Sequence, residues 1–324
     1  MATKSRTSAG MAVGQGFLGF ALVAIGVVGS IATLLGFFGS TWWLFDYVAN
    51  FRAHLAVVLL LVALAYSLMF SKATGLFFMI MAAVNALVIL PLYLGNPAPA
   101  ANGDTFTIIS FNVDQRASIR DVTFRWIDTV DPDVVVLTNV TDDWVHDATE
   151  MAAPYRFLND LPVDRTFGIA ILAREDLDVE VFRVTPVKDV VARIEASIGD
   201  RPVVIYAVQS PAASNERDAA LHDEYFSEVA RLAKQETVST VVVGDFESTS
   251  WSHSFHALLA DGNLVDSLTG YGIQTTWPAD RWTFFRLPYD HLVHSADLTT
   301  VDRYLGPILG VEHRPIVVEL APAA

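Results

Sequence analysis

The chain has 324 residues, of which 52% are hydrophobic and 18% are charged, and its mean hydropathy is +0.40. A soluble domain carries roughly 25% charged residues, so this composition excludes a disordered chain and argues against a wholly water-soluble protein. Cysteine is absent, which excludes disulfide bonds, thiolate metal sites and a cysteine nucleophile.

Charge is distributed unevenly along the chain. Four of the 21 basic and one of the 36 acidic side chains lie in residues 1–100, which leaves 17 basic and 35 acidic residues, a net charge of −18, in residues 101–324. Such an acidic domain repels polyanions, whereas nucleic-acid binding depends on basic side chains that neutralise phosphates. The sequence therefore predicts a membrane segment followed by an acidic globular domain, with no nucleic acid as partner.

Three apolar stretches make up most of the predicted membrane segment, residues 1–95. They cover approximately residues 13–38, 55–70 and 75–94, close to the roughly 20 residues that a membrane-spanning helix needs. A cleaved signal peptide is the alternative for the first stretch, but its apolar core would be only about 7–15 residues long. We therefore expect three retained transmembrane helices.

Basic residues suggest how these helices cross the membrane. Lys4 and Arg6 precede the first stretch and Lys72 separates the second from the third, while Arg52 lies in the opposite loop. Because basic residues are enriched in cytoplasmic loops, we expect a multi-pass protein of the cell membrane with a cytoplasmic N-terminus and an extracytoplasmic C-terminal domain.

The apolar stretches contain no acidic or basic side chain, so they lack the usual sign of an ion or proton path. An anchor in the lipid bilayer is therefore favoured over a transporter. Three polar residues remain as candidates for helix contacts or for binding a membrane-protein partner: Gln15, His54 and Asn85.

Residues 96–103 predict a short, stiff linker, and residues 104–324 predict a globular domain in which strands alternate with helices. Strands are expected over residues 105–113, 134–137, 168–172, 203–208, 240–243, 291–294 and 316–320, and helices over 119–130 and 215–236. This alternation is typical of an α/β domain.

Polar residues follow most of the predicted strands directly. They are Asn112, Asn139, Gln209, Asp245 with Glu247, Asp290 with His291, and Glu312 with His313. Each one alone is equally well explained as a helix cap, a turn residue or a structural histidine. The whole series indicates a site, because α/β folds gather functional side chains where strands end.

Six motifs in this order resemble the endonuclease/exonuclease/phosphatase superfamily, which has the deoxyribonuclease-I-like fold. They are SFN (110–112), DVVVLTNV (133–140), GIAILAR (168–174), GDFESTSW (244–251), YDHLVHS (289–295) and VEHRP (311–315). The resemblance implies a four-layer αββα sandwich. The preceding apolar stretches and Thr276-Trp277-Pro278 resemble the membrane-anchored VanJ- and YafD-type branch, which implies an extracytoplasmic domain and a lipid-linked phosphate as substrate.

Active members of this family hydrolyse phosphoesters with the help of a divalent metal, held by a glutamate on the second strand. The resemblance implies that Asp245, His313, Asp290 and His291 would be catalytic, and that Gln209 and Asn112 would bind phosphate. Mg²⁺ or Mn²⁺ would be the metal, because an attacking water must lose a proton near neutral pH.

The chain departs from the family pattern at four positions. The metal-binding glutamate is Asn139, the histidine of the H-x-x-P motif is Gln209, the asparagine of G-D-x-N is Glu247, and the aspartate of S-D-H is Glu312. Asn139 offers only a neutral carbonyl, and Gln209 cannot act as an acid or base. Glu247 either holds a metal in a shifted place or repels a phosphate. The implied metal ligands are therefore Asn112, Asn139, Glu247 and Glu312.

Two functions fit these departures. The favoured interpretation is a non-catalytic binding, partner or assembly subunit at the cell envelope, with a degenerate site that holds no metal. The alternative is a divalent-metal-dependent phosphoesterase or pyrophosphatase that acts on a lipid-linked or small phosphate. A nuclease is disfavoured by the acidic charge.

Overall fold

The structure, a computed structural model, describes residues 3–95, 104–144, 146, 155–157, 168–174, 180–184 and 191–323. The chain forms two compact units, Met1–Leu90 and Pro91–Ala324. The predicted linker over residues 96–103 lies outside the described residues.

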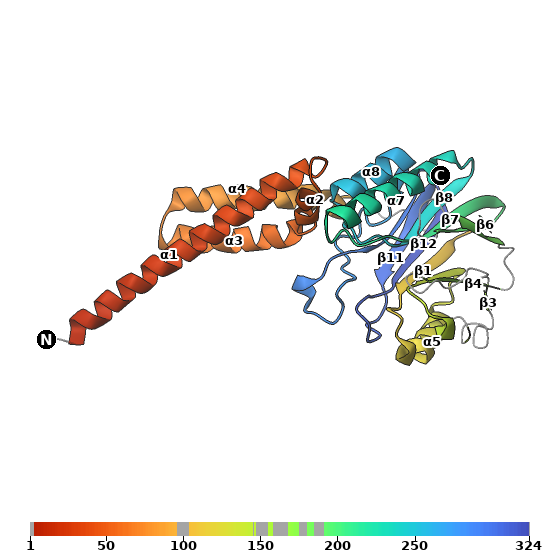
Figure 1. Cartoon of the computed structure of the whole chain (residues 1–324), viewed down its shortest axis with the longest axis horizontal. Helices are drawn as coiled ribbons and strands as arrows, with labels where there is room; N and C mark the ends of the chain where they lie inside the picture. The colour runs from red at the N-terminus through yellow and green to blue at the C-terminus, as the bar shows by residue number, and fades with distance from the viewer. Residues whose placement is uncertain are drawn as a thin grey trace. The chain divides into compact units, whose positions relative to one another are not determined.

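The first unit is helical (Figure 1). Its helices are α1 (Thr3–Leu35), the short η1 (Gly36–Phe38), α2 (Trp43–Ala49), α3 (Arg52–Met69) and α4 (Lys72–Ile89). The short helix η2 (Leu90–Tyr93) follows α4 and lies mostly in the second unit. Gly16–Phe38, Arg52–Met69 and Lys72–Tyr93 are long and apolar enough to cross a membrane, with mean hydropathies of 2.3, 1.9 and 2.3. These segments coincide with the three predicted stretches.

Small residues let the three long helices pack closely. A Cβ on Gly26 of α1 would lie 2.4 Å from the ring of Phe78, a buried residue of α4. One polar contact joins the same helices, because the buried Asn85 side chain donates a hydrogen bond to Thr33 Oγ1 at 2.7 Å. Asn85 therefore serves a helix contact inside this unit, one of the two roles expected for it.

The second unit contains two six-stranded sheets. The first has the order β11-β12-β1-β2-β4-β3 and the second the order β5-β6-β7-β8-β10-β9. The strands are β1 (Phe106–Asn112), β2 (Val134–Thr138), β3 (Tyr155–Phe157), β4 (Ile169–Arg174), β5 (Glu180–Val184), β6 (Val191–Ile198), β7 (Arg201–Gln209), β8 (Ser239–Asp245), β9 (Leu264–Asp266), β10 (Asp290–Ser295), β11 (Leu298–Leu305) and β12 (Ile316–Pro322).

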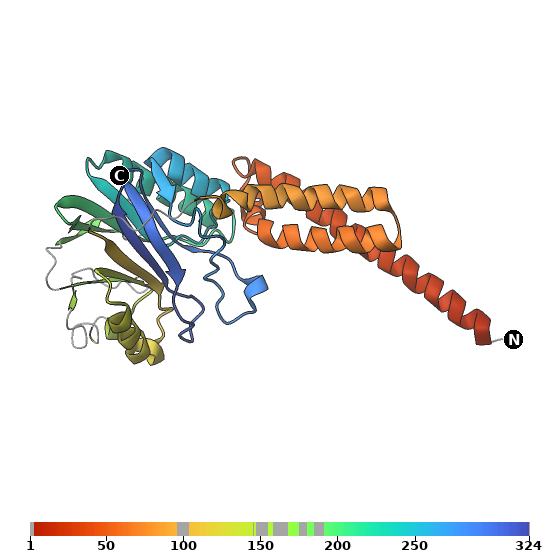
Figure 2. The ribbon, with the colours of Figure 1, turned by 180° about the vertical axis from the view of Figure 1, so that it is seen from behind.

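The two sheets pack face to face, and helices cover their outer faces (Figure 2). The inner core combines Ile108, Val136 and Ile316 of the first sheet with Ile205 and Val243 of the second. Helix α5 (Arg120–Val130) packs on the first sheet, and helices α7 (Glu216–Gln235) and α8 (His253–Gly262) pack on the second. The predicted four-layer αββα sandwich is confirmed.

Strand register brings the predicted polar residues to one edge. Parallel pairing of β1 with β2 sets Asn112 opposite Thr138, and parallel pairing of β7 with β8 sets Gln209 opposite Asp245. β10 runs antiparallel to β8 and sets Asp290 opposite Asp245. Because the carboxyl ends of neighbouring parallel strands lie at the same edge, these side chains converge.

Candidate active site

A buried cluster of Asn112, Asp245, Asp290 and His313 lies at this edge, and we call it the carboxylate–histidine cluster. Asp290 Oδ2 lies 2.8 Å from His313 Nδ1, within hydrogen-bond distance. His313 Nε2 lies 3.4 Å from Asn112 Nδ2 and 3.9 Å from Asp245 Oδ2, while Asn112 Nδ2 donates to Asp245 Oδ2 at 2.8 Å. All four residues are at most 5% exposed.

Backbone contacts fix the orientation of these side chains. The backbone N–H of Asp114 donates to Asn112 Oδ1 at 2.9 Å, which turns the Asn112 amide nitrogen toward Asp245. Thr276 Oγ1 accepts the N–H groups of Tyr289 and Asp290, both at 3.1 Å. The start of β10, and with it the Asp290 carboxylate, is thereby held in place.

The electrostatic balance of the cluster keeps His313 protonated near neutral pH. Burial alone would lower the pKa of His313, but the negative charges of Asp290 and Asp245 outweigh burial and raise the pKa to about 10. Burial, with a contribution from Asp290, raises the pKa of Asp245 to about 6 despite the opposing effect of His313. The cluster therefore combines a charged imidazole with a carboxylate that exchanges protons near neutrality.

Glu247 adds a further carboxyl group next to this cluster. It is half-buried, its φ is 49°, and its N–H donates to Asp245 Oδ1 at 3.1 Å. Burial, followed by repulsion from Asp245, raises the pKa of Glu247 to about 8. Glu247 thus places an acid that is protonated near pH 7 beside Asp245.

Asn139 and Gln209 bond to each other across the two sheets. The Asn139 N–H donates to Gln209 Oε1 at 3.0 Å, and the Gln209 N–H lies 3.2 Å from the hydroxyl of Tyr225. Asn139 itself has a φ of 60°, and its Oδ1 accepts from Gln115 Nε2 at 3.1 Å. Both predicted positions therefore join strand ends through neutral amides.

The structure places two predicted site residues away from the cluster. His291 follows Asp290 in β10 and, since side chains alternate along a strand, points to the other face of the sheet. There its Nε2 lies 2.9 Å from the carbonyl of Ser248, and its ring packs against Phe246 and Phe255. Its pKa is lowered by burial.

Glu312 is the second residue that the structure separates from the cluster. Its side chain is exposed, and its Oε2 lies 3.4 Å from the indole nitrogen of Trp277. The neighbouring His313 is buried in the cluster. The Glu312 carboxylate therefore accepts a hydrogen bond from Trp277 and lies outside the carboxylate–histidine cluster.

Comparison with known proteins identifies the family. The sequence profile of the endonuclease/exonuclease/phosphatase family matches residues 109–312, more than half of the chain. This chain belongs to the endonuclease/exonuclease/phosphatase family. No curated protein sequence matches the chain.

Solved structures support the family fold. D. rerio TDP2 complexed with a single strand DNA product is 16% identical, with a TM-score of 0.54 and coverage of 67% of this chain and 99% of that one. An endonuclease/exonuclease/phosphatase family protein from Bacteroides thetaiotaomicron is 17% identical, with a TM-score of 0.52 and coverage of 69% and 100%. A mannosyl-6-phosphatase from Bacteroides thetaiotaomicron is 17% identical, with a TM-score of 0.50 and coverage of 67% and 99%. At such identities the likeness establishes the fold alone.

The residues present fit a divalent metal, which members of this family use. Carboxylate oxygens of Asp245 and Asp290 lie within 4.8 Å of each other and of a ring nitrogen of His313. The two carboxylates are the candidate ligands, because a protonated His313 has no free ring nitrogen. Asp290 Oδ1 is buried and has no hydrogen-bond partner among the described residues, and such an orphaned carboxylate oxygen suits a hard cation. Carboxylate oxygens suit Mn²⁺ as well as Mg²⁺.

Sequence reasoning did not assign a role in the site to Trp277 or Thr276. The Trp277 ring stacks on Tyr289 with centroids 5.4 Å apart and lies 6.5 Å from the His313 ring, so it forms a wall of the site. Thr276-Trp277-Pro278 is one of the segments that carry the family resemblance. Its contact with His313 is not predictable from the sequence, because the segment is far from Asp245 and His313 along the chain.

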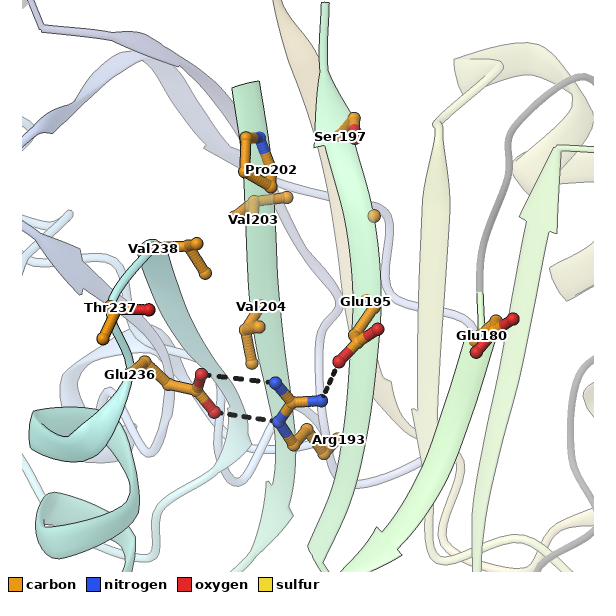
Figure 3. Close-up of a pocket in the computed structure, with 11 residues that line it drawn as sticks. Glu180, Arg193, Glu195, Ser197, Pro202, Val203, Val204, Glu236, Thr237 and Val238 are labelled. Atoms are coloured by element: carbon orange, nitrogen blue, oxygen red, sulfur yellow. Dashed lines mark hydrogen bonds and ion pairs between the residues drawn. The ribbon is translucent and has the colours of Figure 1, made fainter. Parts of the chain in front are cut away.

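A separate cavity of about 490 Å³ lies on the second sheet, lined by residues of β5, β6, β7 and the connection between α7 and β8 (Figure 3). Arg193 occupies it and donates to Glu236 Oε1 at 2.8 Å and Oε2 at 3.2 Å, and it also pairs with Glu195. Tyr206 donates to Glu236 as well. Because Arg193 and both carboxylates are paired within this network, we interpret it as structural.

Proposed function

We propose that this chain is a membrane-anchored, divalent-metal-dependent hydrolase of phosphoric esters or pyrophosphates. The observation that carries the proposal is the carboxylate–histidine cluster, in which a buried imidazole bridges two carboxylates. A buried histidine whose pKa is raised to about 10 by two carboxylates is protonated near neutral pH and suits proton donation.

Each side chain would have a distinct task. Asp290 would orient His313 through Nδ1, so that Nε2 can donate a proton to a phosphoryl or leaving-group oxygen. Asp245, held by Asn112, would orient the attacking water, which would release its proton to solvent. Asp245 and Asp290 would hold the metal, the latter through Oδ1, which has no hydrogen-bond partner in the part of the chain that the structure describes, and Glu247 would be an adjacent carboxyl group. A bound divalent ion would supply positive charge to the phosphate and acidify a bound water.

The substrate class follows from the membrane segment and the charge. With three segments able to span a bilayer and a net charge of −18 in residues 101–324, a lipid-linked or small phosphate suits the protein better than a polynucleotide. Its resemblance to the VanJ- and YafD-type branch supports an extracytoplasmic domain over 104–324, joined by the linker 96–103 to the anchor 1–95.

One observation favours a second function, a non-catalytic binding or assembly subunit at the cell envelope. The position of the family's metal-binding glutamate holds Asn139, whose carbonyl oxygen is already bound by Gln115. In that case the domain would bind a lipid or a membrane-protein partner without turnover.

Titration calorimetry of the full chain in detergent separates the two functions. We expect Mn²⁺ to bind the wild type, Asp245→Asn to abolish binding, and Glu312→Gln, at an exposed position outside the cluster, to leave it unchanged. If only Asn139→Glu binds Mn²⁺, the native site has lost its metal and the binding subunit is the better interpretation.

A further inference from the structure

The connection between β9 and β10 carries an exposed aromatic group. Residues 278–286, which we call the aromatic loop, include Trp282, Phe284 and Phe285, with exposed fractions of 82%, 44% and 58%. Burying such side chains is worth roughly 1.5–3 kcal/mol each, so leaving three together in water is costly. An exposed aromatic group of this kind marks a contact surface.

The aromatic loop has a defined shape. At its base, the Trp277 N–H donates to the Leu287 carbonyl at 3.0 Å, and the Leu287 N–H donates back to Trp277 at 2.5 Å. At its tip, the short helix η4 (Thr283–Phe285) follows Trp282, and Arg286 Nε donates to the carbonyl of Arg281 at 2.8 Å. The loop projects from the second unit in Figure 2. The aromatic side chains are therefore presented by an ordered hairpin.

The loop emerges at the rim of the candidate active site. Trp277, at its base, lies 6.5 Å from the His313 ring and stacks on Tyr289. The Ala279 N–H donates to the carbonyl of Glu312 at 2.6 Å, which fixes the first residues of the loop next to His313. Whatever binds the aromatic loop is thus held beside the carboxylate–histidine cluster.

The charge of the loop differs from that of its surroundings. It contains Arg281 and Arg286 but only one acidic residue, Asp280, whereas residues 101–324 carry a net charge of −18. Arg281 is well exposed, and its pairing with Asp280 at 3.6 Å is at the surface. Aromatic rings flanked by arginine are the composition of segments that lie at the bilayer interface, where arginine meets anionic headgroups.

The same connection is tied to the end of the third candidate span. Leu92 belongs to Lys72–Tyr93, and its carbonyl accepts the N–H groups of Gly270 at 2.9 Å and Gly272 at 2.8 Å. Both glycines have positive φ, 92° and 73°, and they lie within the second unit together with Leu92. Only five residues separate Gly272 from the aromatic loop, so the chain keeps the loop close to the residue where this span ends.

From these observations we propose that the aromatic loop inserts into the headgroup region of the bilayer that holds the anchor, with Arg281 binding anionic phospholipid. The contact would hold the candidate active site at the lipid surface. The inference goes beyond the proposed function, since it requires no turnover and applies equally to a binding subunit.

The absence of cysteine allows a direct test in the full chain. Trp282→Cys and Phe285→Cys each provide one attachment point for an environment-sensitive nitrobenzoxadiazole dye, and Val122→Cys on α5, at a position that is 38% exposed, is the matched control. The labelled proteins are reconstituted into phosphatidylcholine vesicles with and without phosphatidylglycerol, and then into vesicles that contain spin-labelled lipid.

For both loop positions we expect blue-shifted emission and quenching by spin-labelled lipid of about twofold or more, against little change at the control. Phosphatidylglycerol should increase the quenching, and Arg281→Gln should remove that increase. The proposal is overturned if the loop labels behave like the Val122→Cys control. It is also overturned if the blue shift of the loop labels persists in detergent without quenching by lipid, because the loop would then contact its own chain. A blue shift that disappears when added lipid dilutes the protein overturns it too, because the loop would then contact a second copy.

Discussion

Replacement of Glu247 by glutamine should stabilise the protein, increasingly so as the pH rises. The pKa of Glu247 is raised from its ordinary 4.5 to about 8 by burial and by Asp245. A carboxyl group whose pKa is raised on folding binds its proton more tightly in the folded state. The stability that it contributes is therefore lost as the pH rises from 4.5 to 8. Glutamine keeps the size of the side chain and does not titrate.

The magnitude follows from the size of the shift. A rise from 4.5 to about 8, at roughly 1.4 kcal/mol per pKa unit, sets an upper limit of about 5 kcal/mol. Because Glu247 is half-buried and its neighbours relax, we expect about 1–3 kcal/mol at pH 8 and almost no difference at pH 5. For a unit of this size, that range corresponds to a rise in melting temperature of roughly 2–12 °C.

The assay is thermal unfolding of the full chain in detergent with chelator present, followed by tryptophan fluorescence at pH 5 and pH 8. Five of the seven tryptophans lie after residue 100, so the signal reports mainly on the second unit. Glu312→Gln is the matched control, since Glu312 is exposed. The reasoning is refuted if Glu247→Gln lowers the melting temperature at both pH values, or if its effect is equal at pH 5 and pH 8.

Three further predictions concern contacts around the cluster and the charged cavity. Asp290→Asn should lower the pKa of His313 from about 10 toward neutrality, because the amide keeps the hydrogen bond but removes the negative charge. The pKa would be measured by NMR of the histidine rings, with the His313 signal assigned from its loss in His313→Gln. An unchanged pKa of His313 would contradict this prediction. Thr276→Val should cost about 1–3 kcal/mol by leaving two buried N–H groups without their acceptor, while Thr276→Ser should cost less in the same melting assay. Glu236→Gln should lower the free energy of unfolding by about 1–3 kcal/mol at pH 7. Since the hydrogen bond from Arg193 lowers the pKa of Glu236, this loss of stability should vanish as the pH falls through that lowered pKa. An equal loss at pH 3 and pH 7 would argue against it.

Much of the fold could be predicted from the sequence because its strongest signals are local. The apolar stretches revealed the three candidate spans. The buried strands β2 and β8 each contain a run of at least three consecutive apolar residues, VVVL and VVV. β6 was missed because Arg193 and Glu195 alternate with its buried residues and obscure the apolar run. Helix α8 was missed because it is short, although Ser252 caps it by accepting the N–H of Phe255.

The candidate site was predicted only in part because side-chain direction depends on strand alternation and on tertiary contacts. Asn112, Asp245, Asp290 and His313 converge as the motif order indicated. His291, adjacent to Asp290, points to the other face of its strand, and Glu312 turns to Trp277. No local signal distinguishes these neighbours, since only the packing of Phe246 and Phe255 around His291 decides which face it occupies.

The most direct test of the account is phosphoester hydrolysis by the full chain in lipid vesicles with Mn²⁺. Substrates would be bis-p-nitrophenyl phosphate and a lipid pyrophosphate, and His313→Gln would be compared with the wild type. The account predicts turnover that requires the metal and that falls by about 100-fold or more in His313→Gln, since general acid–base groups contribute roughly 10²–10⁴-fold. Turnover that is absent in the wild type, or equal in His313→Gln, would contradict it.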